Sequence, residues 1–147
     1  MKLTKIETSP HTRIDTTVGT RVFAGDQMIH GDTGWRDISD TALVEVTEAR
    51  LFIRRLGNIV YYTADSLLLT NDVPPGVGVV TIPVGFRPVR AFRAGSGATY
   101  ELNAAVYSSS GGMELRTREG ATAGRRRFYL NWVTDNSWPT SLPGLPA

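Results

Sequence analysis

Alternation of apolar and polar residues at every second position is the feature that most constrains how this chain folds. The stretch MELRTRE (113–119) places two apolar residues and a threonine on one side and charged residues on the other. Successive side chains of a β-strand point to opposite sides, so this period indicates a strand with one buried face. The stretch YELNAAVY repeats the pattern. With the turn residues SSSGG between the two, the sequence predicts a hairpin over 99–119.

A second hairpin is predicted in RLFIRRLGNIVYY and the residues that follow it. The strands at 49–55 and 58–69 flank Gly57 and Asn58. Both residue types tolerate the positive φ that a tight hairpin turn demands. We therefore expect these two residues to close the turn.

Two prolines divide the stretch VVTIPVGFRPVRAF. Neither Pro83 nor Pro88 can donate a backbone hydrogen bond to a neighbouring strand, and Gly85 lies between them. The sequence therefore predicts a strand at 79–82, a corner through these three residues, and a second strand around 89–93.

Helical periodicity is weak throughout the chain. The best stretch, SDTALVEVTEARL (39–51), begins with plausible capping residues but is rich in valine and threonine, so it predicts no more than one helical turn. Short strands separated by turns are typical of all-β domains. We predict an antiparallel β-sandwich with an extended N-terminal arm and a C-terminal tail.

Three segments follow from these patterns. Residues 1–33 are predicted to form an attachment or assembly segment: a polar, threonine-rich arm that needs a partner to be ordered, and a small hairpin of 21–24 with 27–30. Residues 34–136 are predicted to form the sandwich. Residues 137–147, which contain three prolines and no strand pattern, are predicted to form a tail that lies over a surface or is free.

Composition excludes several classes of protein. A chain that is 41% hydrophobic and 20% charged is typical of a globular domain. No apolar run approaches the roughly 20 residues of a membrane span, and the start lacks the apolar stretch of a secretory signal. We therefore expect neither membrane insertion nor export. The absence of cysteine excludes disulfides and thiolate metal sites.

Charge is unevenly distributed along the chain. Residues 1–73 hold eight basic and ten acidic residues, whereas residues 74–147 hold eight basic and four acidic residues. The one basic cluster, GRRRF (124–128), is interpreted as a solvated entrance to a strand rather than as a phosphate site. Nucleic-acid binders usually carry a denser basic face with interleaved aromatic residues, so no nucleic-acid partner is predicted.

Catalytic and metal-binding patterns are weak. The two histidines, His11 and His30, both fall in the predicted arm, which is a poor place for a precisely held catalytic group. The stretches AGDQ and HGDTG lack the carboxylate density of a calcium loop and are interpreted as turns. A glycosidase needs only two suitably spaced acids, but the sequence singles out no pair. We predict a protein that is not an enzyme and has no metal or cofactor.

Aromatic residues offer a way to bind sugars, because sugar rings present apolar faces to aromatic rings. Trp132 shares a strand face with Phe128 and Leu130, so it is predicted to be a core residue. Tyr107, on the polar face of its strand, and Trp138, beside Pro139 in the tail, are the predicted ligand-binding residues. The other aromatic candidates are Tyr62 and Tyr129.

Four stretches in fixed order carry a family resemblance: GDTGWRDIS, RLFIRRLGNIVYY, IPVGFRP and WVTDNSWPTSLPG. Over about residues 31–144 this order resembles the C-terminal, head-like domain of minor tail and receptor-binding proteins of tailed bacteriophages, especially those that infect actinobacteria. The chain departs from that pattern at Ile82, where leucine is usual, and in being short and free-standing. The residues of the pattern are interpreted as fold residues rather than as a binding site: Gly34 and Trp35, which lead into the core, Gly57, Asn58, Pro83, Gly85 and Pro88.

The resemblance implies a virion protein with a sandwich of the receptor-binding head type. It implies assembly as a homotrimer in the host cytoplasm, display on the tail beside other tail proteins, and a host cell-envelope glycan as candidate ligand. A minor tail or tail-tip protein with a role in host attachment is the predicted function. The alternative is a capsid decoration or a purely structural assembly protein with no host ligand.

Overall fold

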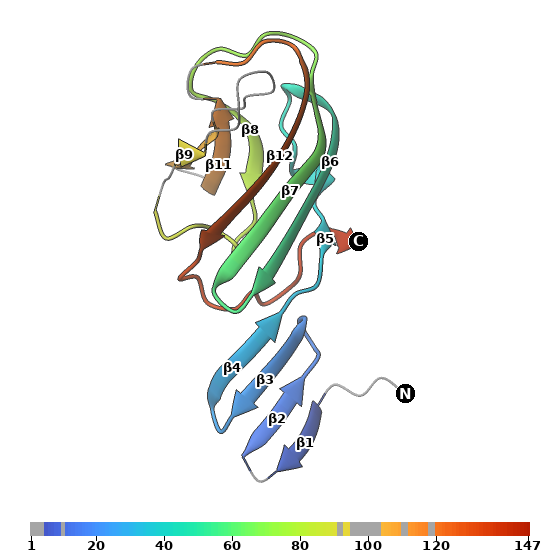
Figure 1. Cartoon of the computed structure of the whole chain (residues 1–147), viewed down its shortest axis with the longest axis vertical. Helices are drawn as coiled ribbons and strands as arrows, with labels where there is room; N and C mark the ends of the chain where they lie inside the picture. Colours follow the sequence, from blue (N-terminus) through green and yellow to red (C-terminus); the bar gives the residue numbers. More distant parts are fainter. Residues whose placement is uncertain (1–4, 10, 91–92, 95–103, 110–111, 118–119) are drawn as a thin grey trace.

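The chain forms an all-β fold of antiparallel strands, as Figure 1 shows. The computed structural model describes residues 5–9, 11–90, 93–94, 104–109, 112–117 and 120–147. Within this part of the chain there is no α-helix, and one 3₁₀ turn, η1 (Ser39–Thr41), accounts for the single helical turn predicted in 39–51. The all-β, antiparallel prediction is therefore confirmed. The main sheet is strongly curled, like half a barrel.

Three long strands build the body of the molecule: β6 (Val46–Leu56), β7 (Ile59–Leu69) and β12 (Gly124–Val133). They pair antiparallel with β7 in the centre. The short strand β5 (Arg36–Asp37) pairs with the other edge of β6, and β13 (Leu145–Pro146) pairs with β5.

A second sheet has the order β8 (Val77–Ile82), β11 (Gly112–Thr117), β10 (Ala104–Ser109) and β9 (Arg93–Ala94). The pairing of β10 with β11 confirms the predicted hairpin over the part of 99–119 that is described. The predicted strand at 79–82 is present within β8. The predicted strand around 89–93 begins later, because residues 89 and 90 form a bend and β9 starts at Arg93.

One buried cluster joins side chains of both sheets. Alternate residues of β6 and β7, such as Leu51 and Tyr62, face this cluster together with Val80 of β8. The rings of Tyr62 and Phe128 stack with centroids 6.0 Å apart. Trp132 is buried in the same cluster, which confirms its predicted place in the core. The full set of buried apolar residues is Ile38, Leu51, Ile53, Val60, Tyr62, Ala64, Leu67, Leu69, Val73, Val79, Val80, Ile82, Phe86, Phe128 and Trp132.

Glycines close the two predicted turns. In the β6–β7 hairpin Leu56 pairs with Ile59, and Gly57 has a φ of +56°. Asn58 does not have a positive φ, so Gly57 alone supplies the left-handed residue, as in a type II′ turn. After β8, the Phe86 amide donates to the Pro83 carbonyl, and Gly85 between them has a φ of +88°. This is the corner that the two prolines predicted.

The N-terminal segment differs from its prediction. Instead of an extended arm followed by one hairpin, it forms a four-stranded antiparallel sheet, hereafter the N-terminal sheet, at one end of the molecule (Figure 1). The predicted hairpin is present as the last two strands, and the polar residues before it pair with one another. The strands are β1 (Lys5–Ser9), β2 (Thr12–Asp15), β3 (Thr20–Ala24) and β4 (Gln27–Asp32).

The C-terminal tail, predicted to lie over a surface or to be free, lies on its own chain. Arg36 Nε donates to the Pro143 carbonyl at 2.9 Å, and β13 ends the chain beside β5. Gly34 and Trp35 precede the buried Ile38, and 38% of the surface of Trp35 itself is exposed. The Trp35 carbonyl accepts a hydrogen bond from the Ala147 amide at 3.2 Å.

Candidate functional site

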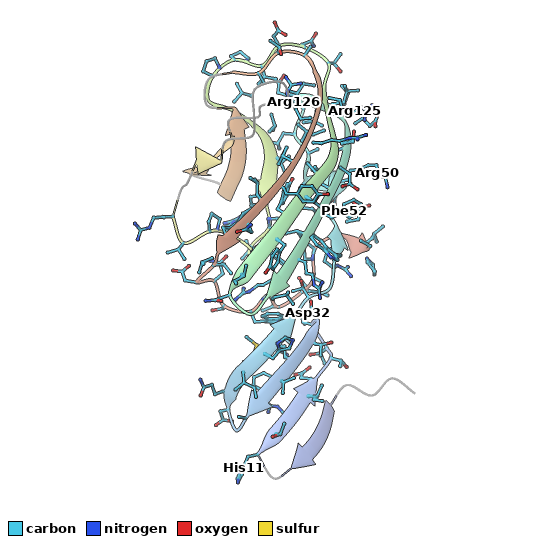
Figure 2. All side chains as sticks on the ribbon, viewed as in Figure 1. His11, Asp32, Arg50, Phe52, Arg125 and Arg126 are labelled. Atoms are coloured by element: carbon cyan, nitrogen blue, oxygen red, sulfur yellow. The ribbon has the colours of Figure 1, made fainter. Side chains whose placement is uncertain are left out.

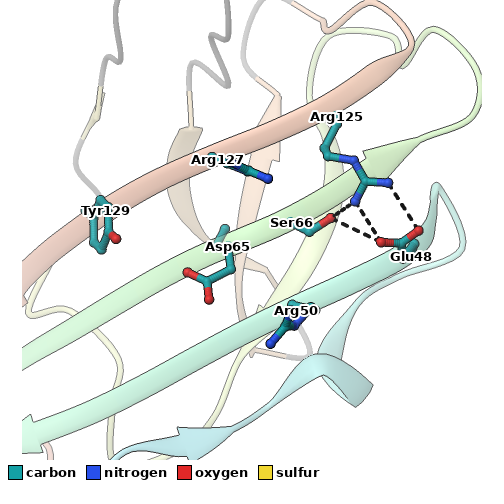
Figure 3. A pocket seen from close by; sticks show the side chains of 8 residues that line it. Glu48, Arg50, Asp65, Ser66, Arg125, Arg127 and Tyr129 are labelled. Carbon is teal, nitrogen blue, oxygen red and sulfur yellow. Dashed lines mark hydrogen bonds and ion pairs between the residues drawn. The ribbon is translucent and has the colours of Figure 1, made fainter.

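A polar depression of about 430 Å³ lies on the outer face of β6, β7 and β12, and we call it the outer depression. It faces away from the core. Figure 3 shows that each of the three strands contributes charged or aromatic side chains to it. The lining residues are Glu48, Arg50, Ala64, Asp65, Ser66, Arg125, Arg127 and Tyr129.

One side of the outer depression is already neutralised. Arg125 Nη1 donates to Glu48 Oε1 at 2.7 Å, and its Nη2 donates to Oε2 at 3.3 Å. Ser66 Oγ accepts from the same guanidinium. The hydrogen bond from Arg125 lowers the pKa of Glu48 and raises the pKa of Arg125, so both groups are charged at neutral pH.

A β-bulge shapes the floor of the outer depression. In the ladder with β6, Ser66 and Ala64 pair with consecutive residues, so Asp65 has no partner. The ladder with β12 shifts at the same place. Bulges re-aim side chains. As a result Ala64, Asp65 and Ser66 all line the depression, although a regular strand would turn every second residue inward.

A second polar cluster lies inside the molecule, at the end of the hairpin between β6 and β7. Arg55 is only 4% exposed and donates only to backbone carbonyls through its guanidinium. Its Nε binds Gly57 at 2.8 Å, its Nη1 binds Gly85 at 2.5 Å and Ser137 at 3.0 Å, and its Nη2 binds Asn136 at 2.8 Å. Burial lowers the pKa of the Arg55 guanidinium, but an arginine stays protonated in proteins.

The backbone of Arg55 adds a further segment to this cluster. Its amide donates to Thr33 Oγ1 at 2.8 Å, and its carbonyl accepts from the Thr33 amide at 3.0 Å. The Asn136 side chain accepts from the amides of Gly85 and Arg87, both at 3.2 Å. The four sequence stretches that carry the family resemblance therefore meet at one residue, Arg55, three through its side chain and the first through its backbone. We call this cluster the Arg55 junction.

Trp138 fastens the N-terminal sheet to the Arg55 junction. Its Nε1 donates to the Val18 carbonyl at 2.8 Å, and its ring lies 5.1 Å from the Arg55 guanidinium. The ring also packs on Gly31 so closely that a Cβ there would lie 2.5 Å from Cζ3. The indole N–H and one ring face are thus already engaged. Ligand binding by Trp138 stays a prediction, with less free surface than expected.

The remaining predicted residues lie apart from the outer depression. Tyr107 is in β10, opposite Glu114 of β11, and its side chain lies outside the described part of the chain. Ligand binding by Tyr107 therefore also stays a prediction. His11 and His30 are exposed, and Figure 2 places His11 at the far tip of the N-terminal sheet. Within the described ranges no three residues of the types His, Cys, Asp and Glu gather closely enough to hold a metal ion.

Sequence reasoning missed both clusters, although a signal was present in each. In the alternation of β6, Leu51 and Ile53 face inward, and Arg55 occupies the next inward position. Arg126 likewise precedes Phe128 on the inward face of β12 and is only 7% exposed. The interpretation of GRRRF as a solvated entrance is therefore wrong for Arg126. A charged residue at an inward position was the available signal.

Comparisons with protein-family models, with curated protein sequences and with solved structures found no match to this chain. The resemblance drawn from the four sequence stretches therefore remains a prediction. No helix in the described part of the chain has the length and hydropathy that crossing a bilayer requires.

Proposed function

We propose that this chain is a structural protein of a tailed-bacteriophage virion, namely a minor tail or tail-tip protein that takes part in host attachment. The observation that carries the proposal is the Arg55 junction. Each of the four stretches is short and weak alone, but all four contact Arg55 or its neighbours. The four stretches therefore belong to one three-dimensional unit. This supports a true family resemblance over a chance similarity of four separate pieces.

The proposal includes a sandwich of the receptor-binding head type and assembly as a homotrimer. The shared core of β6, β7 and β8 supports a second layer opposite the curled sheet. The N-terminal sheet supports attachment to other tail proteins, because none of residues 11–30 is buried. Light scattering tests the oligomer: a mass three times that of the 16.1 kDa chain is expected, and a stable monomer contradicts the trimer.

The proposed role is binding and assembly rather than catalysis, without cofactor, nucleic acid or membrane insertion. The most deeply buried charged group, Arg55, donates only to backbone carbonyls through its guanidinium and so is committed to the fold. A group of charged side chains that includes exposed Arg125 and Arg127 lines the outer depression instead, a shallow surface suited to contact with a larger molecule.

A capsid decoration or purely structural protein without a host ligand is the second candidate. One observation favours it: the N-terminal sheet ends in β1, whose outer edge has no partner strand within the described chain, and open edges pair readily with other proteins. The C-terminal tail does not support this candidate, because Pro143 and Leu145 are held by their own chain.

Immunogold electron microscopy of intact phage particles that carry this protein distinguishes the two candidates. An antibody raised against the purified chain should label the tail end. Label spread over the head would replace the tail assignment with the decoration role, and unlabelled particles with an antibody of proven reactivity would contradict both. Purified protein added before infection should compete with phage adsorption only if the chain binds the host.

A further inference from the structure

Several charged side chains with unused hydrogen-bonding capacity gather in the outer depression. Arg125 is occupied by Glu48, but the guanidiniums of Arg50 and Arg127 have no hydrogen-bond or ion-pair partner among the described residues. Within the described part of the chain the carboxylate of Asp65 accepts one hydrogen bond, from the Thr63 hydroxyl at 3.3 Å. Two guanidinium groups without hydrogen-bond partners and one carboxylate with a single long hydrogen bond therefore line the same space, with positive charge in excess.

Tyr129 adds an apolar platform to this polar set. It lies at one end of the outer depression (Figure 3), and 82% of its surface is exposed. Exposing a large aromatic ring on a strand contributes nothing to the core. An open ring flanked by hydrogen-bonding groups is suited to stack against the apolar face of a sugar.

We infer that the outer depression binds a saccharide that carries a carboxylate or phosphate group. The anionic group would pair with Arg127 and Arg50, because planar guanidinium groups match both anions with two parallel hydrogen bonds. Asp65 would accept hydrogen bonds from sugar hydroxyls, and the Tyr129 ring would cover one ring face. The choice of a saccharide rests on the proposed function, whereas the location of an anion-binding site does not.

A second depression on the surface provides a contrast. It is lined by Pro88, Val89, Arg90, Asn131, Trp132 and Val133. Its surroundings are mainly apolar, and it holds one arginine and no acid. Arg90 is exposed and has no hydrogen-bond or ion-pair partner among the described residues. Substituting Arg90 therefore removes the same charge as substituting Arg127 but leaves the outer depression unaltered.

Isothermal titration of the full chain with three defined probes tests the inference. The probes are a trimer of galacturonic acid, the neutral trimer of galactose, and a short glycerol phosphate oligomer. The acidic probes are expected to bind about tenfold or more tightly than the neutral trimer. The comparison of the two acidic probes distinguishes a carboxylate from a phosphate ligand.

Four variants locate the site. Arg127→Gln and Tyr129→Ala are each expected to weaken binding of the preferred acidic probe about tenfold, whereas Tyr129→Phe and Arg90→Gln should leave it within about twofold. All three positions are exposed, and circular dichroism checks that the variants fold. Chemical shift changes confined to β6, β7 and β12 would give the same location without a variant.

Three results would overturn the inference: no binding of any probe, equal binding of acidic and neutral trimers, or equal losses in Arg127→Gln and Arg90→Gln. None of them decides where the protein sits in the virion. Conversely, label on the phage head would refute the tail assignment but leave saccharide binding by the purified chain unchanged. The two proposals therefore fail separately.

Discussion

The body and the N-terminal sheet are built from the same kind of antiparallel strand, but they bury side chains very differently. The body encloses a continuous cluster of buried apolar residues. In the N-terminal sheet none of residues 11–30 is buried, and Arg13 lies over the Phe23 ring with its guanidinium carbon 4.2 Å from the ring centre. A small sheet without a core is marginal alone. The body therefore accounts for its own stability, whereas the N-terminal sheet depends on the Arg55 junction.

Few contacts join the N-terminal sheet to the body. Among the described residues one ladder pair, Asp32 with Leu56, joins the N-terminal sheet to the body strands, and the Gly57 amide donates to the Gly31 carbonyl at 2.8 Å. The Arg54 guanidinium makes a bidentate ion pair with the Asp32 carboxylate, with nitrogen–oxygen distances of 3.0 and 2.6 Å. Trp138 adds its contacts to Val18 and Gly31. A small number of substitutions can therefore separate the stability of the two regions.

Arg55→Ala is expected to have the largest effect, because it removes the donors of four backbone carbonyls, of which that of Gly85 is buried. We expect the free energy of unfolding to fall by about 3 kcal/mol, measured by urea denaturation. Arg54→Ala is the matched control. Arg54 makes a partly exposed ion pair, so its loss should cost less than about 1 kcal/mol. Equal losses in the two variants would contradict the special role of Arg55.

Gly31→Ala is expected to disturb the contact between the two regions directly. The added Cβ overlaps the Trp138 ring, and overpacking of this kind costs about 2 kcal/mol. Gly25→Ala serves as control, since it meets open space but is strained by a φ of +61°, at a cost of about 1 kcal/mol. The Trp138 indole N–H resonance should shift in the first variant only. An unchanged resonance in Gly31→Ala would show that the ring does not pack there.

The substitution Tyr62→Phe tests the stability of the body without changing the N-terminal sheet. The Tyr62 hydroxyl is buried without a hydrogen-bond partner in the structure, and burial raises its pKa. Removing this hydroxyl should leave stability unchanged or raise it by up to about 1 kcal/mol. Thermal unfolding provides the measurement. A loss of more than 1 kcal/mol would mean that the hydroxyl has a partner.

Acid should weaken the link between the two regions slightly. The hydrogen bond from Arg54 holds the pKa of the Asp32 carboxyl below its ordinary range. A carboxyl with a lowered folded-state pKa stabilises the fold above its unfolded pKa, and this contribution is lost as pH falls through the folded pKa. Below about pH 4 wild type should therefore lose more stability than Asp32→Asn, by less than about 1 kcal/mol, in melting curves recorded from pH 5 to 2.5.

Local patterns in the sequence predicted much of the body. Period-two alternation located β6, β7, β11 and β12, and the turn residues Gly57 and Pro83 marked where strands end. These features depend on near neighbours in the chain, so a single sequence reveals them. The alternation in β12 also identified Trp132 as a core residue.

Long-range contacts explain what the sequence did not predict. The strands β1 and β2 are short and mostly polar, so no clear alternation marks them, and the N-terminal sheet also contacts Trp138, far along the chain. The outer depression was missed because its shape depends on a bulge at Asp65, which inserts one residue and changes the phase of β7. Trp138 was predicted to be a ligand-binding residue because nothing in the proline-rich tail itself indicates that its ring packs on the N-terminal sheet.

Hydrogen exchange in wild type and Trp138→Ala tests most directly whether the junction holds the N-terminal sheet on the body. In the variant, amides of β3 and β4 should exchange at least about tenfold faster, because the sheet loses its main support, while amides of β6 and β7 should keep wild-type protection. Equal acceleration in both regions would show that Trp138 supports the whole fold. Unchanged exchange in β3 and β4 would show that the N-terminal sheet is stable without the junction, and either result would contradict the contrast between the two regions.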